Sequence, residues 1–298
     1  MRIGLIDVDD TTFPNLVLMK LSAYYKDQGA DVELLKPSDV LHGINLFTPY
    51  DKLIGACIFT DNMPIVQALR EQGAEVAGCG TDDKRTLPDE IEHIYPDYSL
   101  YGITNTAYGF LSRGCPRGCP FCIVAGKEGK QSRKVANLSE WWHGQKNIVL
   151  CDPNLLACPD RADLLMQLID SKANVEVNQG FDARLLTDDV IDMINMLKIK
   201  MMHFAWDNPR DEIVPKMLNK FAEKNNLDFR RRRVYVLVNY WSTFDEDLHR
   251  VYWLRDNGYD PYVMVFDKKH ASRDVKRLQR WVNNKFVFRK CEIFGDYK

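Results

Sequence analysis

Short apolar segments alternate with amphipathic helical segments along most of the chain, and this alternation limits the fold more than any other feature. In the first hundred residues, strands are predicted at 2–6, 32–35, 53–59 and 74–78, and helices at 16–26 and 65–72. Strands that alternate with helices are typical of a parallel sheet with helices on its faces. We therefore predict an α/β protein that begins with a parallel, doubly wound sheet domain over residues 1–80.

The alternation starts again after residues 81–104, which are rich in charge, proline and tyrosine and which we predict to be a linker. Helix-end signals accompany this second run: Thr187 is a predicted N-cap, 243–246 reads as a capping box, and Gly258 follows a predicted helix end. Six further strands are predicted, at 108–111, 147–150, 175–177, 201–204, 234–238 and 262–266. The second domain is therefore also expected to be built on parallel strands.

The composition is that of an ordinary globular protein, with 45% hydrophobic and 28% charged residues among 298. The formal net charge of -2 gives no overall electrostatic signal for nucleic acid, and we interpret the short basic run 230–233 as a solvated strand entrance. No apolar stretch approaches the roughly 20 residues of a membrane span, and the chain enters a strand pattern at once. These features predict a cytoplasmic protein that has no membrane partner.

Three of the eight cysteines, Cys115, Cys119 and Cys122, form a C-x3-C-x2-C triplet. Without an export signal, cysteines are more plausibly free thiols or metal ligands than disulfides. Three thiolates at these spacings can hold three irons of a [4Fe-4S] cluster, which ordinarily takes four cysteines, so one iron is left open. The other cysteines show no second close spacing, which disfavours an auxiliary cluster; they are Cys57, Cys79, Cys151, Cys158 and Cys291.

Polar residues follow the predicted strands of the second domain. Since the carboxyl ends of parallel strands share one edge, these side chains are expected at the same rim as the cysteines. Any one of them alone is more often a solvated residue or a helix cap, so the prediction depends on their convergence. The residues are Asp152, Asn154, Asn178, Gln179, Asp182, Asp207, Asn208, Asn239 and Asp267.

Residues from about 105 to 267 resemble the core of the radical S-adenosylmethionine (SAM) superfamily. The resemblance rests on the cysteine triplet after the first strand, on Phe121 just before the third cysteine, and on the six β/α units that follow. It implies a partial (β/α)6 barrel over residues 105–298, with a C-terminal helical extension. It also implies a [4Fe-4S] cluster held by Cys115, Cys119 and Cys122, with SAM bound to the open iron.

The activity implied by this resemblance is reductive cleavage of SAM to methionine and a 5′-deoxyadenosyl radical, which abstracts hydrogen from a substrate. The electron would come from a reductant such as flavodoxin or ferredoxin. The sequence does not name the substrate, because the groups that select it lie on loops.

The resemblance also suggests SAM contacts. The family usually carries a Gly-Gly-Glu-like segment at the end of the second strand, whereas this chain has Asp152 and Asn154 there, as candidates to accept and orient the methionine amine. Residues 178–184 occupy the position that binds the carboxylate and ribose in the family, which gives roles to Asn178, Gln179 and Asp182. Phe121 and Asn239 complete the candidate cofactor contacts.

Two of these candidates have structural alternatives. Arg184 is a natural bidentate partner for a carboxylate, but a structural salt bridge with Asp182 or Asp188 explains it equally well. Asp207 is expected to accept a hydrogen bond from a ribose hydroxyl, and its alternative role is to cap the helix that begins near Asp211.

The first domain is similar to the Rossmann-like domain of cobalamin-binding-type members, and 95–98 resembles the segment that joins the two domains there. The Asp-x-His-x-x-Gly loop that supplies a cobalt ligand is absent, and His42 lies too far from the acidic run 7–10 to replace it. We therefore favour a vestigial or substrate-binding role over cobalamin binding. The acidic run itself is predicted to be a solvated loop.

Two other functions stay open. A structural zinc or iron-sulfur protein would use the triplet together with His143 or His203. A nucleic-acid-modifying radical SAM methyltransferase would use the cations that follow the cluster, although the overall charge favours a mobile basic loop. These cations are Lys127, Lys130, Arg133 and Lys134.

Overall fold

The computed structural model describes residues 1–43 and 49–298, which form two compact units. Unit 1 comprises Met1–Gly109 and Ala136–Lys146, and unit 2 comprises Phe110–Val135 and Asn147–Lys298. Each contains a parallel sheet, so the predicted α/β class is confirmed. No helix in the described part of the chain is long and apolar enough to cross a membrane.

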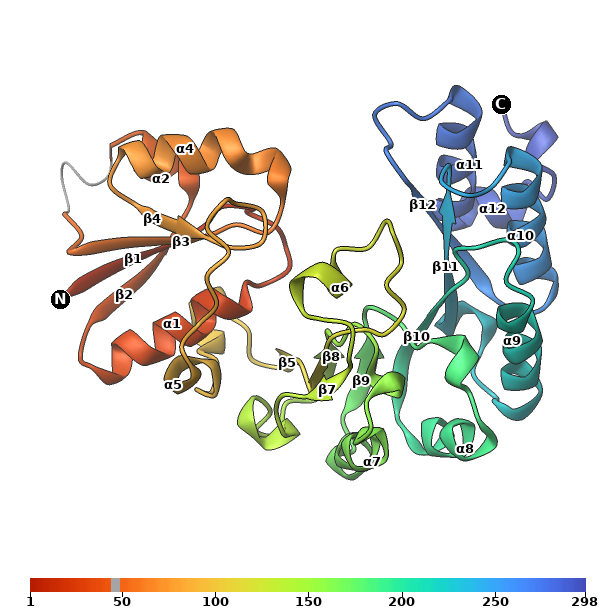
Figure 1. Ribbon diagram of the computed structural model, residues 1–298, viewed down its shortest axis with the longest axis horizontal. Helices are drawn as coiled ribbons and strands as arrows, with labels where there is room; N and C mark the ends of the chain where they lie inside the picture. The colour runs from red at the N-terminus through yellow and green to blue at the C-terminus, as the bar shows by residue number, and fades with distance from the viewer. Residues whose placement is uncertain (44–48) are drawn as a thin grey trace. The chain divides into compact units, whose positions relative to one another are not determined.

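Unit 1 is built on a four-stranded parallel sheet with the strand order β2-β1-β3-β4. Alternate side chains of β1 enter two different cores. Ile3 and Leu5 pack on the face that carries Leu18 of α1, whereas Ile6 packs on the face that carries Val66 of α4. Figure 1 shows α1 and α5 (Asp89–Glu92) on one side of this sheet and α2 and α4 on the other. The elements are β1 (Arg2–Asp7), α1 (Leu16–Asp27), β2 (Asp31–Leu35), α2 (Pro37–Leu41), β3 (Lys52–Ala56), η1 (Thr60–Asn62), α4 (Met63–Glu71) and β4 (Glu75–Ala77).

The acidic run 7–10, which begins at the last residue of β1, is not the solvated loop that the sequence predicts. Asp7 is only 7% exposed and accepts a hydrogen bond of 2.8 Å from the Tyr101 hydroxyl, and burial raises the pKa of its carboxyl. Asp9 accepts the backbone amides of Ile58 at 2.6 Å and Phe59 at 3.2 Å. Because Asp9 takes these amides, β3 ends at Ala56, earlier than predicted.

Residues 81–104, predicted as a linker, contain α5 (Asp89–Glu92) and η2 (Tyr98–Tyr101) and belong to unit 1. Asp97 bonds Ser22 and Lys26 of α1 at 2.6 and 2.7 Å. The Tyr98 hydroxyl donates to the carbonyl of Trp141 at 2.7 Å. These buried and charged contacts fix the segment on unit 1. Strand β5 (Thr106–Gly109) and η3 (Leu138–Glu140) complete the unit.

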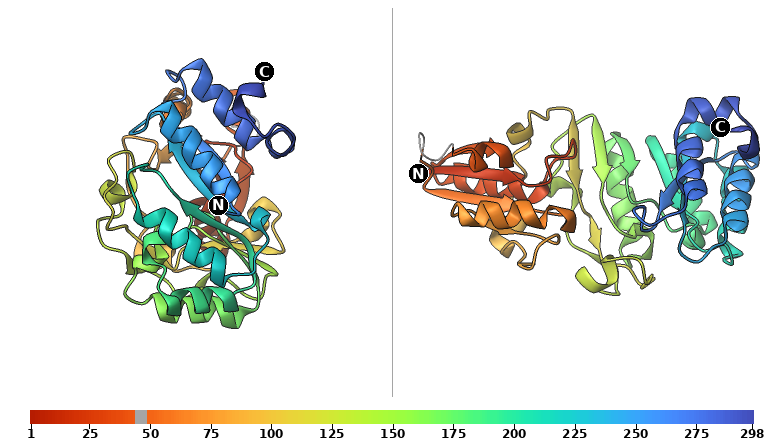
Figure 2. Two further views of the ribbon diagram at one scale, coloured as in Figure 1. Left: turned by 90° about the vertical axis from the view of Figure 1, so that its right-hand side faces the viewer. Right: turned by 90° about the horizontal axis from the view of Figure 1, so that it is seen from above.

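Five parallel strands of unit 2 lie side by side in chain order, from β8 to β12. In the left view of Figure 2, helices of this unit lie in front of its strands. The strands are β8 (Asn147–Leu150), β9 (Asn174–Val177), β10 (Ile199–Ala205), β11 (Arg232–Val238) and β12 (Asp260–Val265). The α-helices are α6 (Val124–Lys127), α7 (Arg161–Ser171), α8 (Asp188–Met196), α9 (Ile213–Lys224), α10 (Phe244–Asp256), α11 (Arg273–Asn283) and α12 (Lys285–Lys290). The short elements are β6 (Ser112–Arg113), β7 (Arg133–Lys134), η4 (Leu155–Ala157), η5 (Ala183–Leu185), η6 (Phe229–Arg231) and η7 (Phe294–Asp296).

The helix-end signals in the sequence are confirmed. The Thr187 side chain accepts the amide of Val190 at the start of α8, and Thr243 and Glu246 form the predicted capping box of α10. α10 ends at Asp256, and Gly258 beyond it has a φ of 75°, which favours glycine. Parallel pairing in chain order brings the carboxyl ends of β8 to β12 to one edge of the sheet.

Candidate active site

A closed loop presents the three cysteines. Its ends are the paired strands β6 and β7, and residues 114–132 between them form what we call the cysteine loop. The two ends of the loop meet at what we call its neck, where Gly114 faces Gln131. Gly114 has a φ of 89°, and a Cβ atom there would lie 2.1 Å from the carbonyl oxygen of Gln131. The Cys115 amide donates to the carbonyl of Gly129 at 3.2 Å. The neck therefore depends on a glycine before the first cysteine.

Asp152, at the end of β8, anchors the strand that leads into this loop. Its carboxylate is 1% exposed and accepts the Leu111 amide at 2.8 Å, the Ser112 amide at 2.5 Å and the Ser112 hydroxyl at 2.6 Å. Burial raises the pKa of Asp152 to about 7, against the lowering effect of these hydrogen bonds. The sequence suggests Asp152 as an acceptor for the methionine amine. In the structure, both of its carboxylate oxygens already accept hydrogen bonds from Leu111 and Ser112.

The three thiols have different surroundings. Cys115 Sγ accepts a hydrogen bond of 3.5 Å from Asn154 Nδ2, and Cys122 is exposed, with its amide bonded to the carbonyl of Cys119 at 2.9 Å. Burial raises the pKa of the Cys119 thiol, and the nearby Asp207 carboxylate raises it further. In the part of the chain that the structure describes, which includes all eight cysteines, no disulfide bond forms. Within residues 1–43 and 49–298, no three side chains of His, Cys, Asp or Glu are placed to hold a metal ion.

A buried polar network lies beside the loop. Asp182 accepts Arg117 Nε at 2.6 Å and Arg184 Nε at 2.7 Å, and it also accepts Asn154 Nδ2 at 3.3 Å. Burial raises the pKa of Asp182, but the two arginines outweigh it and hold the pKa below its ordinary value. Asn154 is 3% exposed, and its Oδ1 has no hydrogen-bond partner among the described residues.

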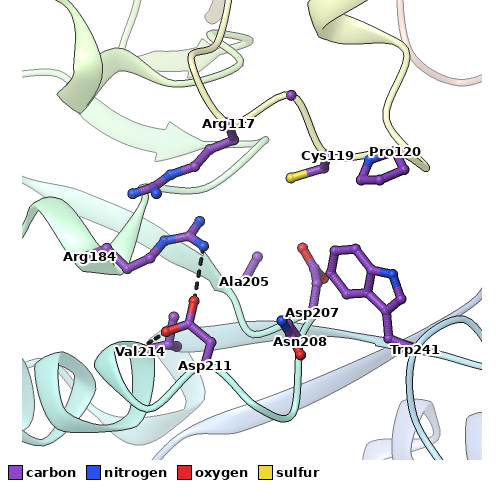
Figure 3. A pocket seen from close by; sticks show the side chains of 11 residues that line it. Arg117, Cys119, Pro120, Arg184, Ala205, Asp207, Asn208, Asp211, Val214 and Trp241 are labelled. Carbon is purple, nitrogen blue, oxygen red and sulfur yellow. Dashed lines mark hydrogen bonds and ion pairs between the residues drawn. The ribbon is translucent and has the colours of Figure 1, made fainter.

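A cavity of about 230 Å³ separates the cysteine loop from the ends of β10 and β11. Cys119, Arg184, Asp207 and Trp241 line it, and Figure 3 shows them around the same space. This volume lies below the roughly 300–1,000 Å³ of drug-sized ligand pockets. The cavity therefore has room for part of a ligand of that size.

Of the structural alternatives for Arg184 and Asp207, the described structure contains the salt bridge of Arg184 but not the helix cap by Asp207. Arg184 does form a salt bridge with Asp182, and its Nη1 bonds Asp211 at 3.1 Å, whereas Asp188 pairs with lysines of α9. Asp211 Oδ1, and not Asp207, accepts the amides of Ile213 and Val214 at the start of α9. Asp207 therefore lines the cavity, and burial raises its pKa to about 6.

Arg250 of α10 holds the two strand ends that line the cavity. Its guanidinium is fully buried and donates to the carbonyls of Asp207 at 2.9 Å and Leu237 at 2.8 Å. It also bonds the buried carboxylate of Asp247 at 2.5 Å. Sequence reasoning missed Arg250, because a charged residue within a helix carries no signal that it is buried.

Tyr240 and Trp241, which surround the predicted Phe121, form a second group that was missed. Phe121 contacts the rings of Tyr240 and Trp241, with centroids 5.4 and 5.5 Å apart, and Tyr240 contacts Phe266 at 4.6 Å. Asn239 has a φ of 66° and donates to the carbonyl of Phe266, so it shapes the turn that presents these rings. Tyr240 and Trp241 closely follow the predicted strand 234–238, and this position at a strand end is the signal that could have identified them.

Among the remaining candidates, Asn208 also lines the cavity, whereas Asn178, Gln179 and Asp267 do not. The main chain of Asn178 bonds Leu150 and Tyr235, and the Gln179 side chain is exposed. His203 is buried and bonds the carbonyl of Val177, and His143 stacks on Tyr95 in unit 1. Among the cations that follow the cysteines, Lys134 pairs with Asp163 and Arg133 bonds the carbonyl of Glu128.

No protein-family model matches the chain. The chain is 23% identical over 189 residues to a CDK5RAP1-like protein of Oryza sativa subsp. japonica, a match that covers 53% of this chain and 29% of that protein. The chain therefore spans less than a third of that relative's length. A crystal structure of Streptococcus suis SuiB bound to precursor peptide SuiA aligns with a TM-score of 0.46 and 13% identity, over 76% of this chain and 58% of that chain.

Proposed function

We propose that this chain is a radical SAM enzyme that holds one [4Fe-4S] cluster through Cys115, Cys119 and Cys122. The observation that carries the proposal is the closed cysteine loop, from which Cys119 lines a cavity at the carboxyl ends of parallel strands. When bound, the cluster would supply the electron that cleaves SAM to methionine and a 5′-deoxyadenosyl radical, which takes hydrogen from a substrate still to be identified.

The residues around the thiols fit such a group. A thiolate ligand is stabilised by N–H donors, and the buried Asn154 amide already donates to Cys115. Its other contact, with an ionised Asp182, fixes which end of the amide faces the sulfur, because a carboxylate accepts hydrogen bonds and does not donate them. Asp152 holds the strand that enters the loop. Together these residues fix the loop that carries the thiols.

The cavity also offers groups for SAM. Arg184 uses Nε and Nη1 for Asp182 and Asp211, and in the described structure Nη2 has no protein partner, so we assign it to the SAM carboxylate. We assign Asp207 to a ribose hydroxyl and the aromatic face of Trp241, whose ring contacts Phe121, to the adenine. Asp152 is left to position the loop.

Anaerobic reconstitution with iron and sulfide, followed by reduction with dithionite in the presence of SAM, tests the proposal. We expect 5′-deoxyadenosine and methionine by chromatography, and loss of both cluster iron and product in Cys119→Ala. Cys151→Ala is the matched control, because Cys151 lies outside the loop and should leave both intact. A Cys119→Ala protein with full iron and product, or a colourless protein that retains only zinc, would overturn the assignment.

A further inference from the structure

The low net charge of the chain conceals a strongly basic segment near its C-terminus. Residues 268–290, which we call the basic segment, contain nine lysines and arginines and a single acidic residue, Asp274. Their formal charge is therefore +8, while the whole chain carries -2. Such an asymmetry points to an anionic partner more directly than the average charge does.

Seven of the nine cations lie on two consecutive helices, α11 and α12, which Figure 1 labels, and Lys268 and Lys269 precede α11. α11 buries Val275, Leu278, Trp281 and Val282. Its cations Arg273, Lys276 and Arg280 have the i, i+3, i+7 spacing of one helix face. On α12, Phe286 is 75% exposed and shares an i, i+3, i+4 face with the exposed Arg289 and Lys290.

Most of these cations have no carboxylate partner. Arg277 pairs with Asp274 at 3.2 Å and Lys285 pairs with Asp260 at 2.8 Å. In the part of the chain that the structure describes, none of the other seven forms an ion pair; they are Lys268, Lys269, Arg273, Lys276, Arg280, Arg289 and Lys290. Like charges on one surface repel, so a bound polyanion would be stabilised there.

We propose that the basic segment binds the backbone of a single-stranded nucleic acid. Arginine forms bidentate hydrogen bonds with phosphate, and three of the unpaired cations are arginines. The exposed ring of Phe286, which shares a face with Arg289 and Lys290, offers a platform on which an unpaired base can stack. An acidic protein would match the charge but would leave this ring without a role, so the aromatic residue favours nucleic acid.

The test measures binding of fluorescein-labelled single-stranded RNA and DNA of about 15 nucleotides, and of duplex DNA of equal length, to the full chain by anisotropy. Binding should weaken as salt rises. The triple variant Arg273→Gln, Arg280→Gln, Lys290→Gln should reduce the slope of log K against log salt by about 2, which corresponds to three lost phosphate contacts. A matched triple at exposed cations without ion pairs elsewhere in unit 2 should keep the original slope; it is Arg161→Gln, Lys198→Gln, Lys216→Gln.

Phe286→Ser should weaken single-strand binding by about fivefold or more and leave duplex binding unchanged. Equal slopes for the two triple variants, or binding that does not respond to salt, would overturn the proposal. Tight binding of polyglutamate that the first triple variant abolishes, with no binding of nucleic acid, would show that the segment serves an acidic protein instead. None of these measurements requires the cluster, so the outcome is independent of the proposed function.

Discussion

Two glycines of the cysteine loop provide a matched test of its geometry. Gly114 and Gly118 both have positive φ angles, 89° and 57°. Alanine at either position would adopt a strained backbone conformation, which lowers the free energy of unfolding by about 1–2 kcal/mol. Their surroundings differ. A Cβ at Gly114 would lie 2.1 Å from the Gln131 carbonyl oxygen, whereas a Cβ at Gly118 would meet nothing within 4 Å.

Gly114→Ala must therefore push backbone apart as well as adopt a strained φ. Overpacking of this kind adds about 1–3 kcal/mol, and the adjoining hydrogen bond from the Cys115 amide to Gly129 contributes about 1 kcal/mol more. We expect Gly114→Ala to lower the free energy of unfolding by about 3–6 kcal/mol, and Gly118→Ala by only about 1–2 kcal/mol.

Urea unfolding of the two variants without cluster, followed by circular dichroism, measures this difference. Iron content after reconstitution provides a second readout, which should fall in Gly114→Ala and stay near the wild-type value in Gly118→Ala. Two variants that unfold at the same urea concentration and load the same iron would refute the reasoning about the neck of the loop.

Three further predictions concern groups around the cavity. Arg250→Met leaves Asp247 buried without its partner and should cost about 3–5 kcal/mol in urea unfolding; a loss under about 1 kcal/mol would contradict the role of Arg250. Asp152 has a pKa of about 7 in the folded chain and about 4 in the unfolded chain. Between about pH 4 and pH 7 its carboxyl is therefore protonated in the folded chain and ionised in the unfolded chain. The free energy of unfolding should therefore fall as pH rises from about 4 to 7, and Asp152→Asn should remove this contribution; equal pH slopes would argue against it. Asn154→Leu removes the donor to Cys115 and should shift the cluster midpoint to a more negative potential in a redox titration, with iron content retained; an unchanged midpoint would rule out this donor role.

The features that sequence reasoning predicted correctly are local ones. Thr187 and Thr243 cap helices because the chemistry of a cap lies within four residues, and the strands of both units follow from short apolar runs. The strand end at Ala56 was missed because Asp9, far away in the chain, takes the amides that would have continued the ladder.

The site could be predicted only in part, since its contacts join distant segments. The pattern places Asp152 at a strand end but does not show that Leu111 and Ser112 occupy both of its oxygens. Arg250 holds carbonyls 13 and 43 residues away, which no local spacing indicates. The basic segment was missed for a different reason, because a net charge averages over the whole chain.

The central claim is that three cysteines hold a cluster with one iron open to SAM. Electron paramagnetic resonance of the dithionite-reduced, reconstituted chain, recorded with and without SAM, tests it most directly. We predict a [4Fe-4S]⁺ signal whose g values change when SAM is added, because SAM binds the open iron. A signal that is identical with and without SAM, or no cluster signal at all, would contradict the account.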